Sequence, residues 1–210
     1  MATHFAQIDL SNLVIGPTET GQNGNKYKQI SYKGQQFKNI QLGASIFDLI
    51  RCPFGAEQVS QKQPDKFCVK IDANTQLSTF IQTMDDMVIK SVTEEPNGDR
   101  SSYLHRSALK ITGEYGTLKI KIQPDTKILV TEFVNDKKIQ TPVCGSKEDI
   151  VAGCMILPII KIQGGVYFLD QSDDGQTYYG TSIVATDILV VKKAAAPPVG
   201  FDLGDVTVED

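Results

Sequence analysis

The sequence predicts a mainly β protein that contains one substantial helix. Apolar and polar residues alternate along much of the chain, which is typical of strands that bury one face. One segment that follows Asn74 breaks this pattern, because its apolar residues recur at the spacing of a helical face. With 210 residues, 40% of them apolar and 22% charged, the chain can bury a substantial core.

The expected strands have the two-residue period of half-buried β structure. The first two form a hairpin that turns near Gly34, and a later pair turns at Asn135 and Asp136. The expected strand segments are 27–32, 36–42, 66–72, 118–122, 127–134, 137–141, 155–162, 165–169 and 181–191.

The expected helix begins after Asn74, whose side chain can cap the first turn. It ends before Pro96, since the residue that precedes a proline disfavours helical geometry. Asp85 and Asp86 occupy adjacent helical positions that point in different directions, so we expect both carboxylates to be solvated. The apolar face consists of Leu77, Phe80, Ile81, Met84 and Val88.

These elements fit an antiparallel Greek-key barrel (OB-like) with one substantial helix and extra hairpins. A β-sandwich or jelly roll produces the same sequence pattern and stays open as an alternative. We expect a single β-rich domain over residues 1–193 and a disordered acidic tail over 194–210.

The tail accounts for the net charge of the chain. The sequence has 21 basic and 25 acidic residues, and four of the acids lie in the segment 197–210, which has no base. A neutral body with an acidic tail is typical of proteins whose body binds a polyanion while the tail competes for that surface or recruits partners. The tail residues expected to act in this way are Phe201, Asp202, Asp205, Glu209 and Asp210.

The composition also indicates a compartment. No apolar run reaches the roughly 18 residues that cross a bilayer, so we expect no membrane partner. The first residues lack the basic and apolar regions of a secretory signal. The four cysteines are widely spaced, so we expect free thiols in an intracellular, reducing compartment.

Catalytic and cofactor motifs are missing from the sequence, so we expect neither an enzyme, a cofactor nor a metal. The two histidines, His4 and His105, are far apart, and neither a nucleophile elbow nor a phosphate-binding glycine loop is found. The string at Asp170, Ser172 and Asp174 resembles the start of a calcium loop, but position twelve would be threonine. A hairpin turn is the favoured interpretation, and a lectin-like calcium module is a distant alternative.

Basic and aromatic residues alternate along the predicted strands, which is the combination that single-strand binders use. Each base stacks on an aromatic ring for roughly 1–3 kcal/mol, while cations follow the phosphates without reading sequence. Protection of sheet edges by lysine and the strand preference of aromatic residues explain the same pattern without a ligand. The candidate nucleic-acid-binding residues are Lys26, Tyr27, Lys28, Tyr32, Lys33, Phe37, Lys38, Arg51, Tyr103, Arg106, Lys119, Lys121 and Tyr179.

The chain resembles single-stranded DNA-binding proteins of large DNA viruses that infect algae and protists, and of some phages. The resemblance lies in a β-rich body joined through a proline-containing linker to an acidic tail with an aromatic residue. In the body it lies in four segments, 51–55, 87–95, 164–168 and 179–182. The chain departs from many such proteins because it has no tryptophan, so stacking would fall to tyrosine, phenylalanine and arginine.

The resemblance implies sequence-independent binding of single-stranded DNA in viral DNA replication, recombination or repair. The tail would recruit replication proteins, and the setting would be the host nucleus or a cytoplasmic virus factory. A non-enzymatic virion structural or minor capsid protein is the alternative, in which the strand lysines protect sheet edges. The sequence leaves open whether the chain forms a homo-oligomer.

Overall fold

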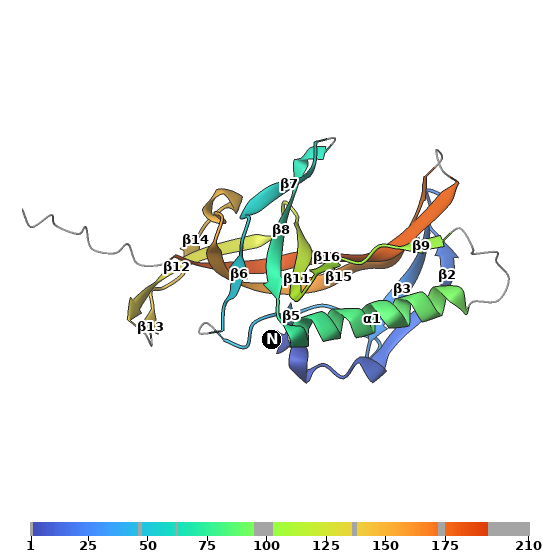
Figure 1. Ribbon diagram of the computed structural model, residues 1–210, viewed down its shortest axis with the longest axis horizontal. Helices are drawn as coiled ribbons and strands as arrows, with labels where there is room; N and C mark the ends of the chain where they lie inside the picture. Colours follow the sequence, from blue (N-terminus) through green and yellow to red (C-terminus); the bar gives the residue numbers. More distant parts are fainter. Residues whose placement is uncertain are drawn as a thin grey trace, which may run out of the picture.

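A computed structural model gives the architecture of the protein (Figure 1). It describes residues 2–45, 48–61, 63–94, 103–135, 138–171 and 175–192. The predicted tail and part of the calcium-like string lie outside these ranges. The residues concerned are Ser172, Asp174, Phe201, Asp202, Asp205, Glu209 and Asp210.

The first half of the chain supplies the short strands and the helix. Its elements are β1 (Thr3–His4), η1 (Phe5–Gln7), η2 (Leu10–Asn12), β2 (Leu13–Thr20), β3 (Lys26–Tyr32), β4 (Gln35–Gln36), β5 (Ile40–Gln41), β6 (Ile50–Cys52), β7 (Ala56–Ser60), β8 (Gln63–Ala73) and α1 (Thr75–Thr93). The second half contributes β9 (Tyr103–His105), β10 (Leu109–Thr112), β11 (Tyr115–Ile122), β12 (Lys127–Asn135), β13 (Lys138–Ile139), β14 (Val143–Cys144), η3 (Lys147–Asp149), β15 (Cys154–Gln171) and β16 (Gln176–Lys192).

The hairpin of β15 and β16 organises the sheet and runs along the long axis of Figure 1. β3, β5 and β6 pair with β15, while β9, β11 and β12 pair with β16. The two strand segments expected at 155–162 and 165–169 are one continuous strand. Its register shifts at Gly164 and Gly165, which adopt φ of 67° and 78°, and Gly165 lets β3 approach closely.

Helix α1 lies along one face of this sheet (Figure 1). The predicted cap is confirmed, since the Leu77 backbone N–H donates to the Asn74 side chain at 2.8 Å. The predicted apolar face is buried against the strands, and the Phe80 ring packs edge-on against Phe5 at 5.5 Å. Asp85 corrects the sequence expectation, because it is buried in this face whereas Asp86 is exposed.

The predicted turn of the first hairpin is confirmed, but two short strands, β4 and β5, replace the continuous strand expected at 36–42. Lys33 and Gly34 both have positive φ, 50° and 74°, and they join Tyr32 to its partner Gln35. The returning strand β4 is only two residues long. The main partner of β3 is therefore β2, an edge strand interrupted at Pro17 that the sequence pattern does not reveal.

The predicted fold class, mainly β with one substantial helix and extra hairpins, is confirmed. The arrangement of strands differs in detail from an antiparallel barrel. β9, β11 and β12 each pair with β16 in parallel, so the sheet is mixed. Within the described residues its path runs from β1 to β7 without closing. Helix α1 is not long and apolar enough to cross a membrane, and no other described helix is.

Candidate nucleic-acid interface

The sheet has one face covered by α1 and an opposite face, called the outer face below. Tyr179 packs on the His105 ring at 5.3 Å, and His105 Nε2 lies 3.5 Å from Asp85 Oδ1 on α1. These residues of β16 and β9 therefore project toward the helix. Because side chains alternate along a strand, the intervening Tyr178 and Leu104 project from the outer face.

A row of tyrosines crosses the outer face. Tyr27 on β3 is the register partner of Tyr167 on β15, and Tyr167 is the partner of Gly180 on β16. The Tyr27 hydroxyl donates to Glu19 at 2.7 Å, which fixes the direction of that ring. A Cβ at position 180 would lie 3.4 Å from the Tyr167 hydroxyl, so Gly180 lies directly beside this ring.

Arg106 lies at the end of this row. Its guanidinium carbon is 3.5 Å from the centre of the Tyr178 ring, a close cation–π contact. The backbone N–H of Arg106 donates to the Tyr179 carbonyl at 2.7 Å. A Cβ at position 180 would lie 2.3 Å from the Arg106 carbonyl oxygen, so only glycine permits this approach.

Asp85 faces both neighbours of Arg106 and hydrogen-bonds to one of them. The Ser107 hydroxyl donates to Asp85 Oδ2, and His105 faces Oδ1 of the same carboxylate. Burial raises the pKa of Asp85, and burial lowers the pKa of His105. Successive side chains of segment 105–107 point to opposite faces, as in a strand. Because His105 and Ser107 point toward α1, Arg106 lies on the outer face.

A basic pocket opens where β11 and β16 diverge. These strands pair only at Lys121 and Val184, and the segment 106–108 bridges the gap between them. Ala108 contributes to this bridge by accepting a hydrogen bond from the Lys119 backbone N–H at 2.9 Å. The resulting cavity of about 190 Å³ is lined by Arg106, Lys119, Lys121, Tyr167 and Ser182 among others.

Within the part of the chain that the structure describes, the positive charge of this pocket has no acidic partner. None of the described ion pairs includes Arg106, Lys119 or Lys121. Burial lowers the pKa of Lys121, and the charges of Lys119 and Lys66 lower it further. Lys70, directly opposite Lys119 on β8, is paired with Glu57 at 2.6 Å. An anion in the pocket would relieve this like-charge repulsion.

A polar groove continues from the tyrosine row. A cavity of about 360 Å³ lies between β3, β4 and β15, and Tyr27 forms part of its wall. Gln29, Gln35 and Gln36 also line it. Since Tyr27 and Tyr167 are register partners, the rings connect the polar groove to the basic pocket. Amide side chains can both donate and accept hydrogen bonds, which suits the edges of bases.

Several predicted residues lie away from the outer face. Lys28, Phe37 and Tyr179 are buried, and Tyr103 is half-buried beside Phe168 on the helix side. The ammonium group of Lys28 donates to the Ser91 carbonyl of α1 at 2.9 Å, which ties β3 to the helix. These side chains support the sheet and have little surface to offer to a strand of DNA.

Other predicted residues, the half-buried Tyr32 and three exposed lysines, lie apart from the pocket. Tyr32 stacks on Phe37 at 5.3 Å, and the Lys33 ammonium lies 5.4 Å from the Tyr32 ring, at the turn of the first hairpin. Lys26 and Lys38 are exposed near the two ends of this hairpin segment. The structure therefore places a second, smaller basic surface on the first hairpin.

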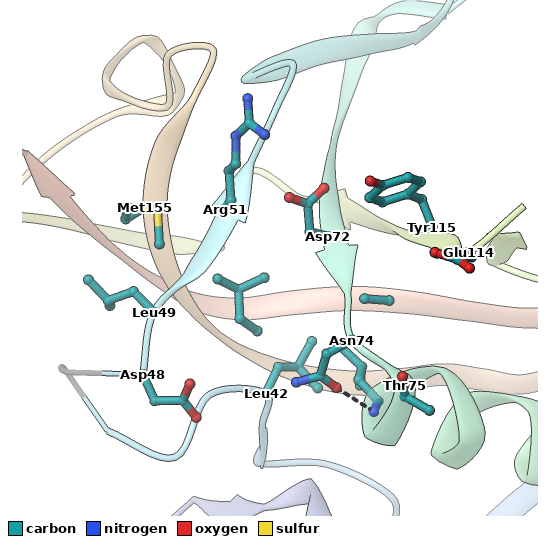
Figure 2. Close-up of a pocket in the computed structure, with 14 residues that line it drawn as sticks. Leu42, Asp48, Leu49, Arg51, Asp72, Asn74, Thr75, Glu114, Tyr115 and Met155 are labelled. Carbon is teal, nitrogen blue, oxygen red and sulfur yellow. Dashed lines mark hydrogen bonds between the residues drawn. The ribbon is translucent and has the colours of Figure 1, made fainter. Parts of the chain in front are cut away.

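Arg51 lies in a different environment. It lines a cavity of about 440 Å³ together with Asp48, Asp72 and Glu114, as Figure 2 shows. Three carboxylates and one guanidinium give this opening a negative charge at neutral pH. Arg51 is therefore a weak candidate for contact with a phosphate backbone.

The outer face also carries Lys66, Tyr167 and Tyr178, which are not among the predicted binding residues. Adjacent tyrosines at 178 and 179 must face opposite sides of a strand, but the sequence does not say which of them faces the core. The signal that distinguishes them is the buried partner of Tyr179, Phe168, which stacks on it at 6.1 Å.

The cluster of Ser107, Asp85 and His105 does not have the order of a catalytic triad. The carboxylate stands between the hydroxyl and the imidazole, so the histidine is not placed to take the serine proton. Within the described ranges, no group of three or more histidine, cysteine or acidic residues could hold a metal ion. That the protein is not an enzyme stays a prediction.

Comparisons with known proteins do not assign the chain to a family. Neither a family model nor a curated protein matches the chain. Among solved structures, it is similar to the single-stranded DNA-binding protein from bacteriophage Enc34 in complex with ssDNA, with a TM-score of 0.35 and 12% identity over 89% of this chain and 98% of that chain. A TM-score of this size carries no argument. Membership of the viral family named above stays a prediction.

Proposed function

We propose that this protein binds single-stranded DNA without reading its sequence, along the outer face of the sheet. The observation that carries the proposal is the basic pocket, in which Arg106, Lys119 and Lys121 converge without a carboxylate partner among the described residues. Such a pocket favours a polyanion because each phosphate replaces lost hydration and relieves repulsion between the cations.

The surroundings of the pocket favour a single strand over a duplex. Tyr27, Tyr167 and Tyr178 bring aromatic rings to the outer face, and unpaired bases can stack on such rings for roughly 1–3 kcal/mol each. Leu104 and Leu169 flank Tyr178 in register and are 41% and 51% exposed, which extends the apolar surface. In a duplex the bases are stacked on each other and cannot reach these side chains.

The path of the strand follows from the order of these features. Phosphates lie in the basic pocket, bases cover the tyrosine row, and the polar groove beside Tyr27 receives the next nucleotides. The contacts are to charge, rings and amides, which every nucleotide can satisfy. The protein therefore serves replication, recombination or repair of a genome, which in the viral setting predicted above takes place in the host nucleus or a cytoplasmic factory.

The acidic tail regulates access to this surface. Its four acids, in a segment outside the described residues, compete with DNA for the basic pocket and recruit replication proteins when DNA displaces them. Deleting 194–210 is expected to tighten binding at low salt and to have a smaller effect at high salt. Unchanged or weaker affinity after the deletion would contradict competition by the tail.

The test of the proposal is fluorescence anisotropy of a labelled oligo-dT of about thirty nucleotides, long enough for more than one typical binding site. We expect tight binding at low salt that weakens steeply with added salt, and much weaker binding of a duplex. No binding at low salt, even after removal of the tail, would refute the proposal. Salt-insensitive self-association in the same samples would then favour the structural alternative.

A further inference from the structure

Two cysteines face each other across a pair of strands that the proposed DNA site does not use. Cys52 ends β6, Cys154 begins β15, and the antiparallel register places them directly opposite. Opposite residues of antiparallel strands project from the same face, with Cα atoms about 4.5–5.5 Å apart. A disulfide requires Cα atoms about 4.4–6.8 Å apart, so this register suits one.

The backbone around the pair holds the two cysteines in this position. The Gly153 N–H donates to the Cys52 carbonyl at 2.8 Å. A Cβ at Gly55 would lie 2.6 Å from the Ile150 carbonyl oxygen, so the turn after β6 packs directly on the turn before β15. Cys52 is completely buried, whereas Cys154 is partly exposed.

The two thiols differ in acidity. The Cys52 thiol has two acceptors within reach, the Gly55 carbonyl oxygen at 3.6 Å and the Cys154 sulfur. The hydrogen bond from Cys52 lowers the pKa of Cys154 and raises the pKa of Cys52, with burial adding to the second effect. Since the thiolate is the reactive form, the partly exposed cysteine is the nucleophile of the pair.

We propose that Cys52 and Cys154 form a peroxide-sensitive pair that closes into a cross-strand disulfide. The Cys154 thiolate attacks hydrogen peroxide, its sulfur gains an oxygen as a sulfenic acid, and hydroxide leaves. The Cys52 sulfur then attacks that sulfur, and the oxygen departs as water with the Cys52 proton. In total two thiols and one peroxide give one disulfide and two waters, with both sulfurs oxidised and both peroxide oxygens reduced.

The other two cysteines lack such a partner and provide controls. Cys144 is exposed, and its strand partner is Leu129. Cys68 is buried, and its register partners are Glu57 on β7 and Lys121 on β11. Peroxide should therefore oxidise Cys144 without an intramolecular partner and leave Cys68 unchanged. The proposed disulfide is a covalent tie between β6 and β15 under oxidising conditions.

The test treats the full chain with hydrogen peroxide, alkylates it under denaturing conditions without reductant and maps its peptides by mass spectrometry. We expect a linked peptide pair containing Cys52 and Cys154, in the native protein and in the control Cys144→Ser. The oxidised protein should also unfold about 10 °C higher than the reduced one, because the tie closes a long loop, and dithiothreitol should reverse the shift.

Three results would overturn the proposal. Cys154 could stop at a sulfinic acid while Cys52 stays alkylatable, or disulfides could form only between chains through Cys144, or peroxide could oxidise Cys52 as readily in Cys154→Ser as in the native protein. All three are read from the peptide map, so the outcome does not depend on an altered chain folding well. Because this pair is remote in sequence from the basic pocket residues, DNA binding by the reduced protein is tested separately.

Discussion

Removing the three pocket cations should lower the salt dependence of DNA binding by a definite amount. The variant is Arg106→Gln, Lys119→Gln and Lys121→Gln, which removes charge while keeping polar side chains of moderate length. Each cation that neutralises a phosphate of single-stranded DNA contributes about 0.7 to the slope of log K against log salt. Three such contacts therefore predict a slope smaller by about 2 in the variant.

The size of the effect on affinity follows from the same relation. Between about 50 and 200 mM salt, a slope of about 2 corresponds to an affinity change of roughly twentyfold. The variant should therefore bind far more weakly than the native protein at low salt. The ratio of native to variant affinity should fall roughly twentyfold between the lower and the higher salt concentration. Anisotropy titrations of labelled oligo-dT at four or more salt concentrations measure both slopes.

A control variant separates a local effect from a change in net charge. Lys90→Gln, Lys127→Gln and Lys192→Gln remove the same charge from α1, β12 and the end of β16. Its slope should remain close to that of the native protein. An unchanged slope in the pocket variant would refute the proposal that these three cations contact phosphates. An equal decrease in both variants would show that the slope follows net charge and not the pocket.

Three further predictions concern the support of this surface. Burial raises the pKa of Asp85 above 3.8, so the native state binds its proton more tightly and loses stability as pH rises through that raised pKa. The unfolding temperature of Asp85→Asn minus that of the native protein should therefore become more positive between pH 4 and about pH 7. A difference that becomes more negative over this range would contradict the prediction. Gly180→Ala should displace Arg106, with a loss of roughly 1–3 kcal/mol in thermal unfolding and weaker oligo-dT binding. Asn74→Ala should cost about 1 kcal/mol in urea unfolding without changing the salt slope.

The elements that the sequence predicts well are those specified by local interactions. The helix after Asn74 has its cap and its apolar face within twenty residues, and both are found in the structure. The turn at Lys33 and Gly34 is likewise a local feature. β2 escaped prediction because Pro17 interrupts its alternation, and its strand pairing depends on β3 rather than on its own pattern.

The candidate site depends on contacts between segments that are distant in the sequence. Local patterns in a single sequence do not predict such contacts. Lys28 has the same alternating neighbours as Lys26, yet the carbonyl of Ser91 on α1 gives it a buried partner. The pocket exists because β11 and β16 meet in parallel and then diverge, a crossover that local patterns leave open. Lys119 and Lys121 were found by alternation, whereas Tyr178 could not be separated from Tyr179 without knowing which face α1 covers.

The helix and the outer face are coupled through one side chain. Asp85 is buried at a cost that an apolar residue at this position would avoid. In return its Oδ2 accepts a hydrogen bond from Ser107, while Oδ1 faces His105 Nε2 at 3.5 Å, so both neighbours of Arg106 point toward the helix and Arg106 projects away from it. An apolar residue at 85 would leave Ser107 and His105 without this partner. The Arg106 guanidinium would then be free to move away from the Tyr178 ring. The buried carboxylate is thus explained by the position of the guanidinium, which points to the outer face as the functional surface.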